Sequence, residues 1–260
     1  MEFITSRDGT PIACWRHGSG TPLLLVHGTS GDHSTWTPVL AGLQQHFTVW
    51  TMDRRGRGHS GDAARYALQR ESEDIAAVVD ALGGNVHLLG HSFGGLCALE
   101  ASLLTTNINK LILYEPSISL TGSSWSVELE TRLQTLLEQD DREQSLLLFF
   151  RDLLKTPDQE LAALRAGPSW PIRLGAAHTI LRELQSIDRY AFTAQRFQTL
   201  QRPVLLLVGG DSHPRRYVTT EKLQQGLPDN RIGILPGQQH SAMRTAPDLF
   251  AQHVLEFLVQ

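Results

Sequence analysis

The chain has 260 residues, of which 41% are hydrophobic and 19% are charged, and these shares exclude a disordered or collagen-like protein. Its 23 lysines and arginines against 27 aspartates and glutamates give a net charge of −4, which excludes a chain-wide basic surface for nucleic acids. The length fits one large α/β domain that carries an insertion.

The chain offers no sign of export, a metal cluster or a membrane anchor. Two cysteines, Cys14 and Cys97, are too few for a disulfide scaffold or a zinc cluster, so we expect two buried thiols. The first residues lack the apolar core of a signal peptide. The longest apolar runs, 146–150 and 204–208, are far shorter than the roughly 20 residues that cross a bilayer. We therefore expect a cytoplasmic protein with neither membrane nor nucleic-acid partners.

Short apolar runs alternate with amphipathic stretches along most of the chain. Strands are expected at 23–26, 47–52, 86–89, 111–114, 204–208 and 232–235, after a hairpin formed by 2–5 and 11–16. Helices are expected at about 70–83, 93–105, 215–225 and 246–258. This alternation predicts an α/β fold whose mostly parallel sheet of about eight strands is flanked by helices.

One long segment, residues 116–200, shows helical patterns and no convincing strand. A helical face at the i, i+4, i+7, i+8 spacing is formed by Leu129, Leu133, Leu136 and Leu137. Thr156-Pro157-Asp158-Gln159 has the pattern of a helix start. We therefore expect a core made of residues 1–115 and 201–260, with 116–200 inserted as a helical lid over one end of the sheet. The alternative is a helical layer that only extends the core.

A serine lies where the predicted strand 86–89 turns into a helix. The sequence there is Gly90-His91-Ser92-Phe93-Gly94, and a Gly-x-Ser-x-Gly pattern alone is weak evidence because it often occurs by chance. Its place between a strand and a helix is more specific, because a sharp turn there holds the serine hydroxyl above the sheet. The helix N-terminus also directs free N–H groups toward the same point. We predict that Ser92 is a nucleophile.

A serine hydroxyl needs a base, and His240 is the best placed of the eleven histidines. It lies in the loop Pro236-Gly237-Gln238-Gln239-His240-Ser241, after the last predicted strand and before the last helix. Loops at the carboxyl ends of strands can bring an imidazole to the nucleophile. The other histidines lie in contexts without such a motif.

Two acidic residues are candidates for orienting that histidine. Asp211 follows the buried run 204–208 and a Gly-Gly turn, and the order Ser92, Asp211, His240 matches the order of nucleophile, acid and base in α/β hydrolases. Glu115 also ends a predicted strand, but Pro116 follows it and favours an extended backbone that leads into the insertion. We therefore predict Asp211 as the acid and a pocket-lining or hinge role for Glu115.

With these motifs in place, residues 3 to 258 resemble the α/β-hydrolase fold superfamily, specifically its small serine hydrolases with a lid. Residues 25–31 resemble the oxyanion loop of that superfamily, and residues 53–60 resemble its Asp-x-Arg-Gly-x-Gly-x-Ser turn. The resemblance implies that the backbone N–H groups of Thr29 and Phe93 form the oxyanion hole. It also implies that His27 is a structural member of the loop.

Departures from the superfamily are also informative. The strand-to-helix turn that carries Ser92 resembles the nucleophile elbow of this superfamily. Relatives that dehalogenate alkanes or open epoxides carry aspartate at the elbow, so Ser92 argues against both activities. Thr29 replaces a bulkier aromatic residue of many relatives, and its side chain could bring a hydroxyl to the oxyanion hole. Gly58-His59-Ser60 imitates the elbow, but Asp62 replaces the second glycine and no strand precedes it.

Together these features predict a serine hydrolase of a carboxylic ester or related acyl compound, acting on a small molecule without a metal or an organic cofactor. Three alternatives stay open because fold does not fix function. The first is a lyase or carbon–carbon hydrolase that uses the same triad. The second is a cofactor-free perhydrolase or oxygenase, and the third is a ligand-binding receptor with negligible turnover.

The substrate cannot be predicted from the residues of the insertion. Its larger aromatic residues, which belong either to the core or to a pocket wall, are Trp125, Phe149, Phe150, Trp170 and Phe192. Arg173 and His178 could meet a polar substrate group, but we expect them on a solvated helix face.

Overall fold

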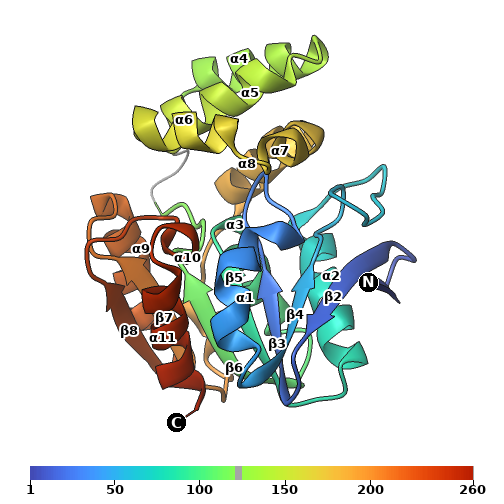
Figure 1. The fold of residues 1–260 in the computed structure, drawn as a ribbon, viewed down its shortest axis with the longest axis vertical. Helices are drawn as coiled ribbons and strands as arrows, with labels where there is room; N and C mark the ends of the chain where they lie inside the picture. Colours follow the sequence, from blue (N-terminus) through green and yellow to red (C-terminus); the bar gives the residue numbers. More distant parts are fainter. Residues whose placement is uncertain (121–124, 260) are drawn as a thin grey trace.

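The computed structural model describes residues 1–120 and 125–259, and it contains one eight-stranded sheet in the order β1-β2-β4-β3-β5-β6-β7-β8 (Figure 1). The strands are β1 (Glu2–Thr5), β2 (Pro11–His17), β3 (Thr21–Val26), β4 (Phe47–Met52), β5 (Val86–His91), β6 (Ile108–Tyr114), β7 (Val204–Gly209) and β8 (Asn230–Leu235). The hairpin of β1 and β2 joins β4 in antiparallel fashion, and β3 to β8 are parallel. The predicted α/β fold with its mostly parallel sheet is confirmed.

Helices cover both faces of the sheet (Figure 1). One face is covered by α1 (Thr37–Leu43) and α11 (Pro247–Leu258), and the other by α2 (Leu68–Ala81), α3 (Phe93–Ala101) and α9 (Pro214–Gly226). Successive strand residues point to opposite faces, so Leu23 and Leu25 pack with α1 and α11 while Leu24 and Val26 pack with α2 and α3. The continuous apolar runs seen in the sequence follow from burial on both faces.

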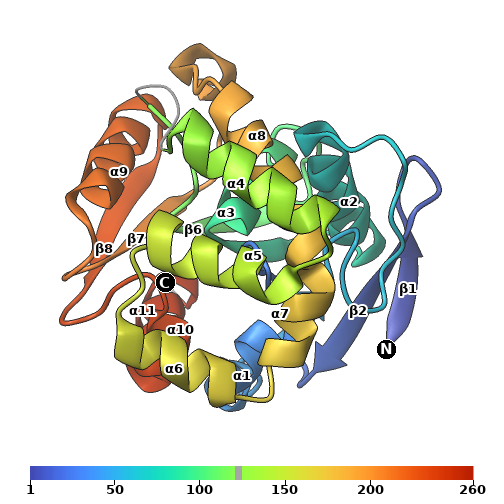
Figure 2. The same ribbon diagram turned by 90° about the horizontal axis from the view of Figure 1, so that it is seen from above.

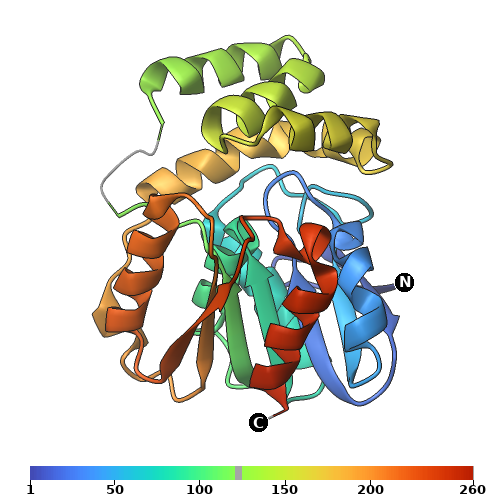
Figure 3. The same cartoon turned by 60° about the vertical axis from the view of Figure 1, so that its left-hand side comes forward.

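The chain between β6 and β7, which we call the helical insert, lies above the carboxyl ends of the parallel strands (Figures 2 and 3). Its helices are α4 (Val127–Glu138), α5 (Arg142–Leu148), α6 (Asp158–Ala166), α7 (Trp170–Ala176) and α8 (Ile180–Arg189). Ser126 caps α4 by accepting a hydrogen bond from the Leu129 N–H, and Asp141 caps α5 in the same way through Gln144. Residues 121–124 of the predicted insertion lie outside the described part of the chain.

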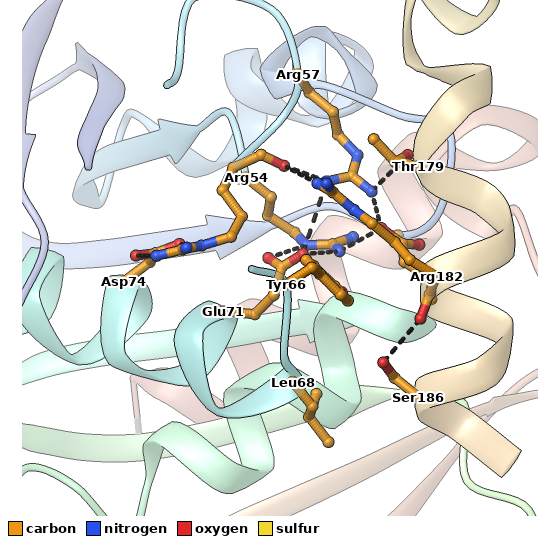
Figure 4. A network of polar contacts seen from close by, with 12 residues as sticks. Arg54, Arg57, Tyr66, Leu68, Glu71, Asp74, Thr179, Arg182 and Ser186 are labelled. Carbon is orange, nitrogen blue, oxygen red and sulfur yellow. Dashed lines mark hydrogen bonds and ion pairs between the residues drawn. The ribbon is translucent and has the colours of Figure 1, made fainter. Parts of the chain in front are cut away.

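Four buried charged residues join the insert to the core, and we call them the insert-anchoring cluster: Arg54, Arg57, Glu71 and Glu183. Figure 4 labels the first three of them. Arg54 donates from Nε and Nη2 to both carboxylate oxygens of Glu71 on α2, at 3.0 and 2.8 Å. The same Nη2 lies 2.6 Å from Oε1 of Glu183 on α8, which also pairs with Arg57. Two cations and two anions therefore balance each other inside the protein.

Several local predictions are confirmed and two elements differ. Cys14 and Cys97 are both free and buried, and Ser60, the imitation of the elbow, donates its hydroxyl to the Asp53 carbonyl. The helix that begins after Thr156-Pro157 is α6, and Gly167 ends it. The short α1 was not predicted, and α3 ends at Ala101 and not at the predicted residue 105. No helix in the described ranges is long and apolar enough to cross a membrane.

Candidate active site

Ser92 occupies a strained turn between β5 and α3. Its φ of 56° and ψ of −123° lie outside the regions that non-glycine residues usually adopt. A side chain at Gly94 would approach the His27 carbonyl oxygen to 2.2 Å, and one at Gly90 would approach the Gly94 carbonyl oxygen to 2.5 Å. The two glycines are therefore required by the close packing of the turn, which presents the serine hydroxyl at the carboxyl edge of the sheet.

His240 reaches Ser92 from the loop between β8 and α10 (Ala242–Thr245). Its Nε2 lies 3.0 Å from the Ser92 Oγ, within hydrogen-bonding distance. The loop is held from below, because the His91 Nε2 lies 2.8 Å from the His240 carbonyl oxygen and the Tyr114 hydroxyl donates to the Gln239 carbonyl. Although His91 adjoins the serine, it positions the histidine loop and makes no contact with the hydroxyl among the described hydrogen bonds.

The carboxylate beside the histidine is that of Glu115, which directly follows β6. Its Oε2 lies 2.6 Å from the His240 Nδ1. Its Oε1 accepts hydrogen bonds from the Gly209 N–H at 2.9 Å and from the Ser212 hydroxyl. Burial alone would raise the pKa of this carboxyl, but His240 and Arg216 lower it to about 2, so Glu115 carries a negative charge.

The structure does not bring Asp211 to His240, which corrects our preference between the two acids. The Asp211 side chain is exposed, and its carboxylate makes no hydrogen bond or ion pair within the described ranges. The Gly-Gly turn serves another purpose, because a side chain at Gly209 would approach the Gln238 carbonyl oxygen to 2.4 Å. Gly209 thus allows β7 to pack against the histidine loop while its N–H binds Glu115.

The expected oxyanion-hole residues lie next to Ser92. Thr29 and Ser92 line the same two cavities, and Phe93 is the first residue of α3. Neither backbone N–H donates a hydrogen bond within the described part of the chain, so both are available to a ligand. His27 is fully buried and holds the neighbouring loop, since its Nδ1 lies 2.8 Å from the Gly28 carbonyl oxygen and its Nε2 accepts from the Arg54 N–H.

Two polar neighbours of the catalytic groups were missed in the sequence. The Ser117 Oγ lies 3.1 Å from the Ser92 Oγ. The Nη2 of Arg216, on α9, lies 3.4 Å from the His240 Nε2, and its Nε lies 3.6 Å from the Glu115 Oε2. Ser117 follows the predicted strand 111–114 closely, but Arg216 lies within the predicted helix 215–225, so no signal in the sequence distinguished either residue from other polar residues.

Burial and the nearby Arg216 lower the pKa of His240 below its usual value, and these effects outweigh the hydrogen bond and charge of Glu115, which raise it. The imidazole is therefore neutral near pH 7. A neutral Nε2 can accept a proton from the serine hydroxyl, as a general base must.

Two cavities, of about 280 and 290 Å³, meet at Ser92. The first has both apolar and charged walls, and the charged residues are Lys155, Glu115, Glu160, Asp211, Arg173, Arg215, Arg216 and Arg244. The second shares Arg215 and Arg216, and its other walls are mainly apolar, with Ile118, Leu120, Phe149, Leu154, Leu184 and Ile187. Residues of both the core and the insert line each cavity, as expected if the insert covers a pocket.

Some of the insert residues for which the sequence left both roles open lie in the core, and others line a cavity. Phe149 and Phe150 line cavities, whereas Trp170 is buried beside Phe150 with the ring centroids 6.3 Å apart. His178 is exposed, as expected. Arg173 is buried and lines the first cavity, so the expectation that it lies on a solvated face is wrong.

A possible metal-binding group lies outside these cavities, formed by Asp32, His33 and Asp53, whose ligand atoms lie within 4.8 Å of one another. The Asp53 carboxylate already accepts hydrogen bonds from the N–H groups of His33 and His59, and its Oδ1 lies 2.8 Å from the His33 Nδ1. These bonds explain the group as part of the turn that follows β4.

Comparison with known proteins agrees with the observed fold. A model of the alpha/beta hydrolase family matches residues 23–253. The crystal structure of an alpha/beta hydrolase from Sphaerobacter thermophilus has a TM-score of 0.86 and 33% identity, covering 98% of this chain and 99% of that one.

Two characterised activities are found among more distant relatives. The pimeloyl-[acyl-carrier protein] methyl ester esterase of Nitrosomonas europaea is 26% identical over 90% of this chain and 94% of its own length. The N-formylmaleamate deformylase of Pseudomonas putida is 27% identical over 86% and 83%, respectively. The chain belongs to the alpha/beta hydrolase family, and the expectation of a hydrolase enzyme is confirmed.

Proposed function

We propose that this hydrolase cleaves carboxylic esters of small molecules through a triad of Ser92, His240 and Glu115. The observation that carries the proposal is the chain of contacts from the Ser92 Oγ to the His240 Nε2, at 3.0 Å, and from the His240 Nδ1 to the Glu115 Oε2, at 2.6 Å. The ester esterase from Nitrosomonas europaea among the relatives supports the same reaction class.

Acylation follows from this arrangement. The Ser92 Oγ attacks the ester carbonyl carbon while the His240 Nε2 takes the hydroxyl proton. The negatively charged Glu115 holds the imidazole by its Nδ1–H and stabilises the imidazolium. The N–H groups of Thr29 and Phe93 donate to the oxyanion, and removing one such donor costs about 3–4 kcal/mol in typical enzymes. The intermediate then expels the alcohol, which receives the proton from His240.

Deacylation repeats these steps with water. Water attacks the acyl carbon as His240 takes one of its protons, and collapse of the second tetrahedral intermediate returns that proton to the Ser92 Oγ. The products are a carboxylic acid and the free enzyme. In this proposal the helical insert is a lid that forms one wall of both cavities and selects the substrate.

The proposal is tested with a fluorophosphonate probe and intact-mass measurement. The wild-type protein is expected to gain one probe adduct, and Ser92→Ala is expected to gain none. Ser117→Ala is the matched control, because its hydroxyl lies 3.1 Å from the Ser92 Oγ and should not be the site of labelling. Labelling of Ser92→Ala at the wild-type rate would exclude Ser92 as the nucleophile.

A further inference from the structure

Arg173, on α7, is a buried cation in the wall of the first cavity. Its side chain is 8% exposed, and its Nη1 donates to the Oγ and the carbonyl oxygen of Ser30 at 3.0 and 3.4 Å. Within the described ranges, neither its Nε nor its Nη2 has an acceptor, and no carboxylate lies within ion-pair distance. Arg173 is therefore a buried charge without a counter-ion.

Two other buried arginines of this protein are each paired with a carboxylate. Arg54 uses its Nε and Nη2 to bind both oxygens of Glu71, and Arg55 uses the same two atoms to bind Asp74 at 2.7 and 2.6 Å. This edge of the guanidinium matches the geometry of a carboxylate. In Arg173 the equivalent edge has no partner.

The nearest acidic residues do not supply the missing charge. Asp32 accepts hydrogen bonds from the N–H and the hydroxyl of Ser34, and Glu160 pairs with Arg244 at 3.1 Å. Burial and the nearby Arg244 lower the pKa of Arg173 to about 10, which leaves the guanidinium charged at neutral pH. The Ser30 oxygens and the Phe150 ring, whose centroid lies 5.5 Å from the Arg173 Cζ, are neutral groups. A buried cation without a counter-ion destabilises the folded state, and an anionic ligand would offset that cost.

The same cavity holds a second cation without a carboxylate. The Nη2 of Arg215 donates to the Leu153 carbonyl oxygen at 3.3 Å, and Arg215 takes part in no ion pair among the described residues. The second cavity shares Arg215 and Arg216 with the first, but Arg173 lines the first alone. The charge of Arg173 without a counter-ion therefore distinguishes the first cavity from the second.

We propose that the natural substrate carries a carboxylate away from the scissile bond and that Arg173 pairs with it. The anionic arm occupies the first cavity and an apolar arm occupies the second, with the ester carbonyl between them at Ser92. This inference rests on the proposed function, since it names the class of ester that the same site hydrolyses.

Three esters of matched shape test the preference. Benzyl pentanoate is neutral, monobenzyl glutarate carries a carboxylate on the acyl side, and the pentanoate ester of 4-(hydroxymethyl)benzoic acid carries one on the alcohol side. The wild-type kcat/KM is expected to be about 10- to 100-fold higher for at least one anionic ester than for benzyl pentanoate, as charged hydrogen bonds of this kind allow. Equal or lower values for both anionic esters overturn the proposal.

Arg173→Met removes the charge and keeps the apolar stem of the side chain. We expect it to lower kcat/KM for the preferred anionic ester about tenfold or more, and to change that for benzyl pentanoate less than about threefold. Arg165→Met is the matched control, because Arg165 is an exposed arginine of the same insert that pairs with Glu143 outside the cavity. An equal loss on both esters would show a structural role and overturn the proposal.

Protection from the fluorophosphonate probe separates the two proposals. Glutarate is expected to slow the labelling of wild-type Ser92, and to do so less in Arg173→Met; equal protection, or none, contradicts the anionic subsite. This readout needs no turnover, so it applies even if none of the three esters is hydrolysed. If Arg173→Met does not fold, the anionic subsite is still tested by Arg173→Lys and by the wild-type ratio of kcat/KM between the anionic esters and benzyl pentanoate. Absence of labelling in the wild type instead refutes the proposed function.

Discussion

Two buried polar clusters lie beneath the helical insert, and they differ in how their charges are satisfied. In the insert-anchoring cluster, Arg54 and Arg57 meet Glu71 and Glu183, and each carboxylate contacts both arginines. The other cluster surrounds Ser92, where Glu115 meets His240 and Arg216 beside two cavities. In the first cluster the charged groups bind one another, whereas the second cluster lies beside cavities that a ligand can enter.

This difference agrees with a structural role for the insert-anchoring cluster and with the catalytic role that we propose for the residues around Ser92. Balanced charges that bind one another fix the position of the insert, and removing one of them leaves an unpaired buried charge. The cluster around Ser92 lies beside a cavity. It contains a serine with a strained backbone, the neutral imidazole of His240 and backbone N–H groups without acceptors in the described ranges, and such features are typical of functional sites. We therefore expect mutations in the insert-anchoring cluster to lower stability, and mutations in the cluster around Ser92 to lower activity.

The largest expected effect is on activity at Ser92. Ser92→Ala should lower the kcat for ester hydrolysis by about 10⁶-fold, because the covalent route is lost and only the oxyanion hole and binding remain. The midpoint of urea unfolding should stay near that of the wild type, since the Ser92 hydroxyl forms no part of the insert-anchoring cluster. A variant that unfolds at much lower urea concentration would break the proposed division of roles.

The second expected effect compares the two acids. Glu115→Gln should lower kcat up to about 10⁴-fold, because an amide no longer favours the required tautomer and charge of His240. Asp211→Asn should change kcat only a few-fold, since the Asp211 side chain is exposed. Steady-state kinetics on one neutral ester measures both variants. The opposite ranking would restore Asp211 as the acid.

The fold and the elbow could be predicted because their signals are local. Strands buried on both faces appear as apolar runs, and the Gly-x-Ser-x-Gly turn lies within five residues between such a run and a helix. The short α1 was missed because its seven residues are too few for a clear helical period. The strands and the turn at Ser92 thus depend on residues that are close together in the sequence.

The contact between Glu115 and His240 could not be predicted because it depends on residues that are distant in the sequence. Glu115 and Asp211 follow the adjacent strands β6 and β7, and both therefore lie at the edge of the sheet that also carries the His240 loop. Glu115 adopts a φ of 43° and not the extended backbone expected before a proline, and hydrogen bonds from Gly209 and Ser212 fix its carboxylate. The burial of Arg173 likewise depends on how the insert packs on the core.

The third prediction concerns the insert-anchoring cluster. Glu183→Gln should lower the free energy of unfolding by about 3–5 kcal/mol, because Arg54 and Arg57 lose the charge of a shared buried partner. The exposed pair of Glu143 and Arg165 in the same insert provides the control, and Glu143→Gln should cost about 0–1 kcal/mol. Urea unfolding measures both. If Glu183→Gln lowers kcat strongly and leaves stability unchanged, the two clusters do not have the separate roles proposed for them.

The smallest expected effect is a shift in the pH profile. The neutral His240 imidazole is the active form, so activity is present above its pKa and lost as the pH falls through that value. Because burial and Arg216 lower this pKa, the acidic limb of kcat/KM should lie below the usual value of 6.5.

Arg216→Gln removes a positive charge near Nε2, which raises the pKa of His240 and should move the acidic limb to higher pH. A neutral ester is the right substrate, since it excludes effects of Arg216 on an anionic arm. Arg165→Gln, which changes the net charge equally at an exposed site, should leave the limb in place; equal shifts in both variants would show that the effect comes from overall charge and not from contact with His240.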